Sequence, residues 1–363
     1  MRLVKADENG IQQAAGVIRN GGCVAMPTET VYGLGADAFN PEAVRAVYAA
    51  KDRPGDNPLI LHIADKVQLT DIAADVPDYA WKLADAFWPG PLTLVVRKKA
   101  GLPPYVGGHP ERETDTAGVR MPSHPVALAV IRASGCIVAA PSANKAGTPS
   151  PTCAAHVEDD YRDSALAPDM LLDGGPVEVG VESTVVDVTG DAPVILRPGA
   201  VTAEMAGEVL GQEISGSVPS GSVPRAPGMK YRHYAPKATM TLLSGPPKAV
   251  ASYITTQIVS DIDAHIGVLA SPGVQNYINS NWNLMSVQGD SVYTPMVSVL
   301  TLGDGGDLPA IAKNLYANLR KFDELGVDII LAEALPETGL GAAIMDRMNK
   351  AAQGRRIRLG VDA

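Results

Sequence analysis

Two periodicities alternate along the first 210 residues of the chain. Apolar residues spaced three and four apart predict helices, and short apolar runs bounded by turn residues predict strands. The predicted helices cover 8–20, 41–51 and 78–87. The predicted strands lie within 23–35, where a short strand runs into a turn, and within 57–63, 92–98, 136–144, 183–188 and 194–199. Strands mixed with helices indicate a layered α/β or α+β fold.

The pattern changes between about 211 and 238. The stretch "SGSVPSGSVPRAPGMKYRHYAPK" is rich in Ser, Gly and Pro and then becomes basic and aromatic, which is typical of a linker. Strands alternating with a helix then resume, as in βαβ units. We therefore predict a first domain over 1–210, a linker over 211–238 and a smaller α/β domain over 239–363.

Composition narrows the class of protein. The 363 residues are 46% hydrophobic and 19% charged, with a formal charge of −10, as in a globular protein that lacks a general nucleic-acid-binding surface. Three separated cysteines form no CxxC pair, which argues against a disulfide framework or a cysteine-rich zinc site. The first residues lack a signal-peptide core, and no run of about 18 apolar residues could span a bilayer. We expect a soluble, cytoplasmic protein without membrane contact.

Common catalytic signatures are missing from the sequence. It contains no GxxxxGK[ST], no GxGxxG opening a helix after the first strand, no HExxH, no GxSxG and no kinase set. Polar clusters instead follow several predicted strands, where ligands of open α/β sheets bind. The clusters are "PTETVYGLGAD", "KDRPGDNPL" with the histidine of "NPLILHI", "TDTAGVRMPSHP", "AAPSANKAGTPSPT", and "GVESTVVDV" with "LRPGAV".

Each cluster also has an ordinary structural interpretation. The threonines could cap a turn, and Lys51 and Arg53 could be solvated. His62 could be a core histidine, and Arg120 could belong to a structural ion pair. If Lys51, Arg53, Arg120 and Arg197 converge, however, they form an anion site suited to a polyphosphate, because arginine offers forked donors and lysine a point charge.

The ordered blocks resemble the YrdC/Sua5 family over about residues 8–205. They are "PTETVYGLGADA", "AKDRPGDNPLILHI", "FWPGPLTLVV", "VRMPSHP", "PSANKAGTPSPT" and "VESTVVD". The linker "APGMKYRHYAPK" and "TGLGAAIMDRMNKAA" resemble the two-domain Sua5 branch. The resemblance implies an open, twisted mixed α/β sheet in a YrdC-like catalytic domain and a Rossmann-like C-terminal domain.

The same resemblance implies a nucleotidyltransferase, the family's threonylcarbamoyl-AMP synthase activity. Such enzymes convert L-threonine, bicarbonate (or CO2) and ATP to threonylcarbamoyl-AMP and diphosphate, for N6-threonylcarbamoyladenosine (t6A) in tRNA. Threonine would be held by Thr30, His62, Arg120, Ser183 and the backbone of Ala140. ATP would be surrounded by Lys51, Arg53, Asn57, Thr116, Ser142, Asn144, Ser150, Arg197 and Tyr234. Lys51 and Arg53 would be the catalytic cations.

No side-chain nucleophile is needed for this reaction, so positioning and charge neutralisation would carry catalysis. Mg²⁺ is expected on the triphosphate, and the linker would act as a lid that protects the carbamate from water. Two alternatives remain open: an RNA-binding regulatory module that uses the basic–aromatic strip of the linker, and a carbamoyl-adenylate-forming maturation enzyme. Transient contact with tRNA-modification proteins also stays open.

Overall fold

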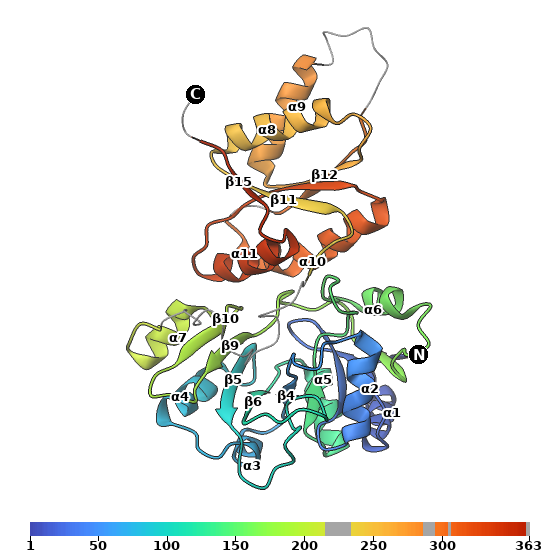
Figure 1. Ribbon diagram of the computed structural model, residues 1–363, viewed down its shortest axis with the longest axis vertical. Helices are drawn as coiled ribbons and strands as arrows, with labels where there is room; N and C mark the ends of the chain where they lie inside the picture. Colours follow the sequence, from blue (N-terminus) through green and yellow to red (C-terminus); the bar gives the residue numbers. More distant parts are fainter. Residues whose placement is uncertain (215–233, 286–294, 304–305, 361–363) are drawn as a thin grey trace. The chain divides into compact units, whose positions relative to one another are not determined.

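The computed structural model describes residues 1–214, 234–285, 295–303 and 306–360, and the chain divides into two units (Figure 1). The N-terminal unit comprises Met1–Ala146 and Ser150–Tyr231, and the C-terminal unit comprises Gly147–Pro149 and Arg232–Ala363. Most of the predicted linker, and with it the expected lid, lies outside the described residues. Each unit is described by itself below.

The described part of the N-terminal unit is built on a ten-stranded mixed sheet. Its strand order is β1-β8-β2-β3-β7-β4-β6-β5-β9-β10, and β4 runs parallel to β6 but antiparallel to β7. This mixture confirms the expected mixed α/β sheet. The strands are β1 (Arg2–Lys5), β2 (Val24–Pro27), β3 (Tyr32–Asp37), β4 (Ile60–His62), β5 (Leu92–Arg97), β6 (Thr116–Arg120), β7 (Val138–Ala140), β8 (Met170–Asp173), β9 (Thr184–Asp187) and β10 (Val194–Arg197).

The α-helices in the described part of this unit each bury part of their surface. Helix α1 buries Gly10, Ala14, Ala15 and Ile18, and it packs against α5 (Figure 1). This spacing is the amphipathic pattern that predicted α1 from the sequence. The helices are α1 (Glu8–Arg19), α2 (Pro41–Lys51), the 3-10 helix η1 (Lys66–Gln68), α3 (Leu69–Ile72), α4 (Asp78–Phe87), α5 (Pro125–Ser134), α6 (Ala154–Tyr161) and α7 (Ala203–Leu210).

Helix α2 has local reasons to begin and end where it does. The Asn40 side chain accepts hydrogen bonds from two backbone amides of the first turn, and Pro41 takes the first helical position, where its missing N–H costs nothing. Asp52 adopts a left-handed conformation (φ 53°) and stops the helix. Lys51 is therefore the last helical residue, and Arg53 begins the Pro-rich bend.

The sequence prediction lacks one strand. The short strand that runs into a turn is confirmed by β2 and the turn at Thr28, but Tyr32–Asp37 then forms strand β3 between β2 and β7. Glycine normally weakens a strand, which explains the error. Here it is required by packing, because a Cβ on Gly35 would lie 2.8 Å from Val138 Cγ1 on the neighbouring strand.

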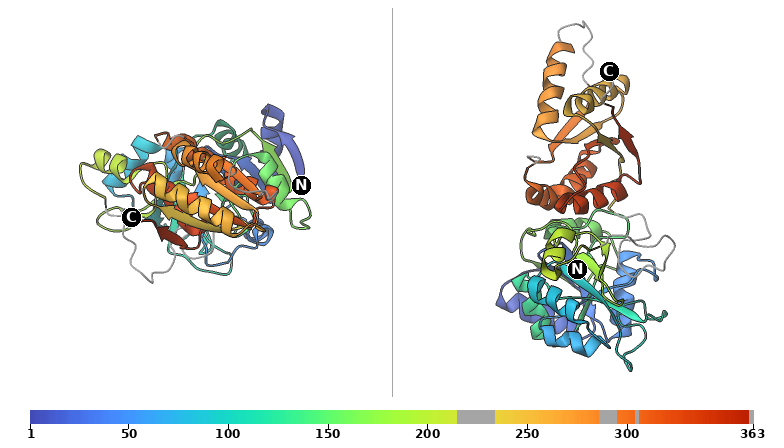
Figure 2. Two further views of the ribbon diagram at one scale, coloured as in Figure 1. Left: turned by 90° about the horizontal axis from the view of Figure 1, so that it is seen from above. Right: turned by 90° about the vertical axis from the view of Figure 1, so that its left-hand side faces the viewer.

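The described part of the C-terminal unit contains a five-stranded sheet, ordered β13-β12-β14-β11-β15, whose pairs are all parallel. Helices α8 and α9 cover one face and α10 and α11 the other (Figure 1; Figure 2, right), as expected for a Rossmann-like domain. The elements are β11 (Thr239–Ser244), α8 (Pro247–Ser260), β12 (Ile266–Ala270), α9 (Pro272–Met285), β13 (Val297–Thr301), α10 (Leu308–Leu325), β14 (Ile329–Glu333), α11 (Leu340–Ala351) and β15 (Arg356–Arg358).

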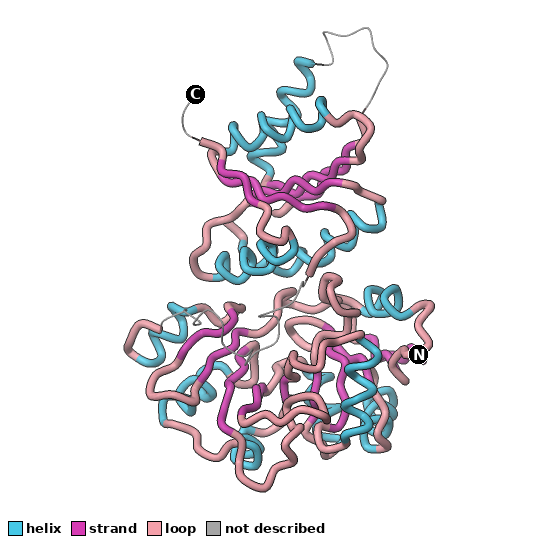
Figure 3. Tube along the Cα trace, in the orientation of Figure 1, coloured by secondary structure: helices cyan, strands magenta, loops and turns pink. Residues whose placement is uncertain are grey.

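Loops connect the strands and helices of the N-terminal unit (Figure 3), and parts of the predicted polar clusters lie in those at 28–31, 52–59, 121–124 and 141–153. None of the helices in the described ranges is long and apolar enough to cross a membrane.

Candidate active site

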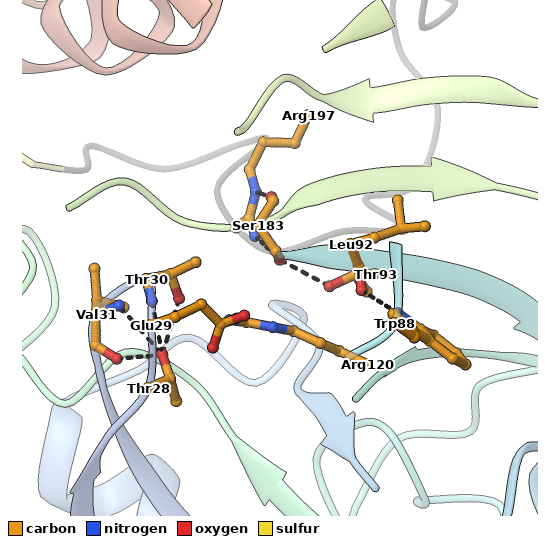
Figure 4. Close-up of polar contacts among 10 residues, drawn as sticks. All are labelled: Thr28, Glu29, Thr30, Val31, Trp88, Leu92, Thr93, Arg120, Ser183 and Arg197. Carbon is orange, nitrogen blue, oxygen red and sulfur yellow. Dashed lines mark hydrogen bonds and ion pairs between the residues drawn. The ribbon is translucent and has the colours of Figure 1, made fainter. Parts of the chain in front are cut away.

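A buried ion pair lies where two strands of the N-terminal sheet end (Figure 4). Glu29 follows β2, and Arg120 is the last residue of β6. Arg120 Nη2 lies 2.7 Å from Glu29 Oε1, and the two side chains are only 5% and 4% exposed. The contact lacks hydrogen-bond geometry, so Arg120 Nε and Nη2 and both Glu29 oxygens have no hydrogen-bond partner among the described residues. Buried polar atoms are rarely left in this state, which marks the pair as a place for a ligand.

The charges of this region are set by the same pair. Burial alone would raise the pKa of Glu29, but the positive charge of Arg120 holds it below its ordinary value, so Glu29 is a carboxylate. His62 pairs in register with Arg120 across β4 and β6. Burial, followed by the charge of Arg120, lowers the pKa of His62 to about 3. Its Nδ1 lies 3.1 Å from Ile60 O, so the neutral ring donates there and leaves Nε2 as an acceptor.

The threonine turn beside this pair is itself hydrogen-bonded. Thr28 Oγ1 donates to Val31 O at 2.6 Å and accepts from the amides of Thr30 and Val31, which is the ordinary turn-capping role. Thr30 Oγ1 lies 2.9 Å from Thr28 Oγ1, and either hydroxyl can be the donor. Thr30 is fully buried, and with either donor its hydroxyl keeps at least one lone pair that can accept a hydrogen bond from a ligand.

Ser183 and Arg197 meet across β9 and β10. Arg197 donates from Nη2 to Ser183 Oγ at 3.1 Å and from Nε to Ser183 O at 3.1 Å. Ser183 Oγ also lies 2.8 Å from Thr93 Oγ1 on β5. Strands β5 and β6 are antiparallel with Leu94 opposite Val119, so Thr93 and Arg120 are neighbours across the two strands. The contacts of Thr93 and Ser183 therefore lie beside the Glu29–Arg120 ion pair.

Lys51 is hydrogen-bonded to the loop that follows β7. The residue is 2% exposed, and Nζ donates to the carbonyls of Ser142 and Asn144. The Lys51 carbonyl accepts from Ala146 N at 2.8 Å. Burial, followed by the charge of Arg53, lowers the pKa of Lys51 well below its ordinary value. An incoming anion would restore the ammonium, which makes this a site prepared for negative charge.

The bend that follows α2 places the second cation beside a buried amide. Arg53 donates from Nε to Asn57 O at 3.0 Å and from Nη2 to Pro58 O at 2.6 Å. Asn57 Nδ2 is buried and has no hydrogen-bond partner within the described part of the chain. Thr116, the half-buried first residue of β6, lies at the opposite end of that strand from Arg120.

The loop after β7 contributes three small polar side chains. Ser142 Oγ donates to Asn144 Oδ1 at 2.6 Å. Ser150 is fully buried and donates to Glu182 Oε1 at 2.6 Å. The charge of Glu182 also acts on Lys51. The loop thus connects Lys51 with the segment that carries Ser183.

These contacts bring most of the predicted residues together on the N-terminal sheet. One group surrounds Arg120, the other surrounds Lys51 and Arg53, and the Ser150–Glu182 contact links the second to the Ser183–Arg197 segment. Ala140, the last residue of β7, lies opposite Ile60 of β4 and thus beside these strands. The roles assigned to these residues stay predictions.

Tyr234 belongs to the C-terminal unit. It is 5% exposed, stacks on Tyr316 with ring centroids 5.4 Å apart, and has the guanidinium of Arg347 at 6.0 Å from its ring centroid. Its backbone is left-handed, with φ 63°. The ATP contact expected of Tyr234 stays a prediction.

The described residues contain no group of three or more His, Cys, Asp or Glu side chains that could hold a metal ion.

The fold and site define a two-unit α/β protein whose mixed sheet carries buried cations and small polar groups for an anionic ligand. The family model Sua5_yciO_yrdC, described as "Telomere recombination", matches residues 16–199. The model Sua5_C, described as "Threonylcarbamoyl-AMP synthase, C-terminal domain", matches residues 201–353. The chain therefore belongs to the Sua5/YciO/YrdC family.

Similar proteins match nearly the whole chain. A threonylcarbamoyl-AMP synthase of Bacillus subtilis (strain 168) is 44% identical over 96% of this chain and 94% of its own length. One of Pyrococcus abyssi (strain GE5 / Orsay) is 43% identical, with coverage of 98% and 97%. The structure of P. abyssi Sua5 complexed with L-threonine has a TM-score of 0.84 at 42% identity, covering 99% of this chain and 98% of that one.

Three polar residues of this region were not assigned a role from the sequence. Glu29 stands in the quoted "PTET" block, yet nothing local indicates that it would pair with Arg120, 91 positions away by their numbers. Glu182 stands in "VEST" and contacts Ser150. Thr93 is an inconspicuous strand residue, and only the register of β5 reveals its contact with Ser183.

Proposed function

We propose that this chain is an enzyme that joins L-threonine, bicarbonate or CO2, and ATP to give threonylcarbamoyl-AMP and diphosphate. The observation that carries the proposal is the full-length identity of 38–44% to threonylcarbamoyl-AMP synthases of a bacterium, an archaeon and a yeast. The product supplies the threonylcarbamoyl group of t6A in tRNA. We place the reaction in the cytoplasm and leave room for transient docking of tRNA-modification proteins.

The threonine subsite is assigned to the group around Arg120. The guanidinium binds the threonine carboxylate through its forked donors. His62 Nε2 and the Thr30 and Ser183 hydroxyls then face the remaining polar groups of the amino acid, with the Ala140 backbone beside them. The unpartnered Arg120 nitrogens support this assignment, because a carboxylate would satisfy them.

The ATP subsite is assigned to the group around Lys51 and Arg53. An ammonium has three N–H donors, and the two carbonyls that Lys51 contacts leave one for a phosphate oxygen. Arg53 and Arg197 add charge. The remaining ATP contacts fall to Asn57, Thr116, Ser142, Asn144, Ser150 and Tyr234. Mg²⁺ is proposed as the divalent ion, bound to the triphosphate as it enters.

Catalysis then consists of positioning and charge neutralisation. The threonine nitrogen forms a bond to the carbon of bicarbonate or CO2, giving a carbamate. A carbamate oxygen forms a bond to the α-phosphorus as the P–O bond to diphosphate breaks. Lys51 and Arg53 stabilise the charge that moves onto the diphosphate. We assign this chemistry to residues 1–210, with 211–238 as linker and lid and 239–363 as the accessory domain.

Mass spectrometry of a reaction mixture tests the proposal. The purified chain is incubated with ATP, L-threonine, isotopically labelled bicarbonate and Mg²⁺. A threonine-linked adenylate that carries the label is expected, and it should disappear when threonine, bicarbonate or ATP is omitted. ATP consumption independent of threonine, or salt-dependent RNA binding without any adenylate, would reject the proposal.

A further inference from the structure

Glu29 is a buried carboxylate beside the residues assigned to threonine. Both of its oxygens lack a hydrogen-bond partner among the described residues, and Oε1 lies 2.7 Å from Arg120 Nη2. We propose that Glu29 is the general base that removes a proton from the ammonium group of L-threonine. The inference rests on the proposed function and names the residue that makes the substrate nucleophilic.

The reaction needs such a base. Threonine carries an ammonium group near neutral pH, and an ammonium nitrogen has no lone pair with which to attack carbon. A base must therefore stand within hydrogen-bond reach of the nitrogen in the bound substrate. Neither Lys51 nor Arg53 suits this task. The guanidinium of Arg53 stays protonated. Nζ of Lys51 is directed at two loop carbonyls and is assigned to phosphate, whose negative charge favours the ammonium form.

The geometry matches the two charges of an amino acid. Its carboxylate and ammonium are attached to the same carbon, so a site that holds both needs a cation and an anion side by side. Arg120 and Glu29 provide this arrangement, and Figure 4 shows the Glu29 carboxylate directed at the Arg120 guanidinium. When the substrate carboxylate takes the guanidinium, Glu29 is left to face the ammonium.

Other titratable groups around Glu29 fit the base role less well. His62 is held neutral by burial and by Arg120, and its Nδ1 is committed to Ile60 O. His124 is half-buried, and burial lowers its pKa, against the opposing charges of Glu29 and Glu178. Glu178 itself is exposed. Glu29 is thus the buried carboxylate placed beside Arg120.

Two opposing influences act on the Glu29 carboxyl. Burial is the strongest and raises its pKa, whereas the charge of Arg120 lowers it. A bound threonine carboxylate offsets the Arg120 charge, while the threonine ammonium takes the place of the positive charge beside Glu29. Transfer of one proton from the ammonium to Glu29 removes both of these buried charges at once, which favours the transfer in a site of low exposure.

The proton balance is simple. One N–H bond of the ammonium breaks, its electron pair stays on nitrogen, and the proton moves to a Glu29 oxygen. With bicarbonate as the carbon source, the nitrogen lone pair forms the N–C bond as the C–OH bond breaks. The departing hydroxide takes the second nitrogen proton and leaves as water, and Glu29 returns its proton to solvent after product release.

The test compares two directions of the same reaction in a Glu29→Gln variant. The forward direction, from threonine to threonylcarbamoyl-AMP, requires loss of the ammonium proton. The bond exchange of the reverse direction does not, because diphosphate attacks supplied threonylcarbamoyl-AMP to give ATP and carbamate. Glu178→Gln, an exposed carboxamide change in the same unit, is the matched control. Thermal unfolding verifies that each variant is folded.

We expect Glu29→Gln to lose about 10²–10⁴-fold in forward turnover, the usual contribution of a general base, and to keep most of the reverse rate. Its residual forward rate should rise about tenfold per pH unit, because it draws on free amine from solution. Glu29→Asp should recover part of the forward rate. Equal losses in both directions, or a pH profile parallel to that of the unmodified chain, would overturn the role of Glu29. If the unmodified chain itself shows neither direction, the proposed function fails instead.

Discussion

Lys51 offers the sharpest single substitution in the ATP subsite. Replacing it with Met keeps an unbranched side chain, one atom shorter, and removes the charge. Lys51 is 2% exposed, and its Nζ donates to two loop carbonyls, Ser142 O and Asn144 O. Lys51→Met therefore removes a cation from the phosphates and also releases the loop that carries Ser142 and Asn144.

The expected loss can be estimated from these contacts. Removing one preorganised donor from developing charge costs about 2.7–4 kcal/mol, so kcat/KM for ATP should fall about 10²–10³-fold. The free energy of unfolding should change less, by about 1–3 kcal/mol. Two carbonyls lose a donor, but the cost of burying an ammonium also disappears.

The assay is diphosphate release against ATP concentration at saturating threonine and bicarbonate. Lys99→Met, at an exposed lysine of the same unit, is the control and should behave as the unmodified chain does. A folded Lys51→Met variant with unchanged kcat/KM for ATP would refute the placement of Lys51 on the phosphates.

Three further substitutions probe the rest of the site. Arg53→Ala removes a charge-assisted contact of roughly 1.5–3 kcal/mol, so kcat/KM for ATP should fall about 10- to 150-fold; unchanged ATP kinetics would reject that role. Arg120→Lys keeps the charge but loses the fork, so steady-state kinetics should show a raised KM for threonine and an unchanged KM for ATP; the opposite result would count against the threonine assignment. His62→Gln tests a pH dependence of stability. Because the pKa of His62 is lowered from 6.5 to about 3, only the unfolded chain gains a proton between these values. The free energy of unfolding should thus be highest above pH 6.5 and fall by up to about 1.4 kcal/mol per unit toward pH 3. The free energy of unfolding, measured by urea unfolding at several pH values, should depend less steeply on pH in the variant. The same pH dependence in both proteins would disprove a buried neutral histidine.

Much of the fold follows from local signals in the sequence. Helix α2 carries its own start and stop, with a capping asparagine, a first-turn proline and a left-handed residue after Lys51. Apolar runs likewise predict β4, β5 and β12. The sequence does not predict strand β3, because its two glycines disfavour strands locally, whereas the close approach of Val138 requires a glycine at Gly35. Strand order was not predictable either, because it depends on contacts between residues far apart in the chain.

The residues of the candidate site could be predicted from the sequence, but their contacts with one another could not. The cations and small polar residues can be recognised in the sequence, because they stand in apolar, Gly-rich or Pro-rich segments. Their contacts cannot be recognised there, because the Arg120–Glu29 pair and the Thr93–Ser183 contact depend on the register of the strands. The sequence allowed Arg120 to be either part of a structural ion pair or a ligand-binding cation. The structure shows an ion pair with Glu29 in which Nε and Nη2 of Arg120 still lack a hydrogen-bond partner among the described residues.

Isotope exchange between diphosphate and ATP tests the central claim most directly, namely that buried cations hold ATP while carboxylated threonine displaces diphosphate. Labelled diphosphate should enter ATP when threonine and bicarbonate are both present. Exchange that proceeds without threonine, or no exchange in a folded protein supplied with every substrate, would contradict the account.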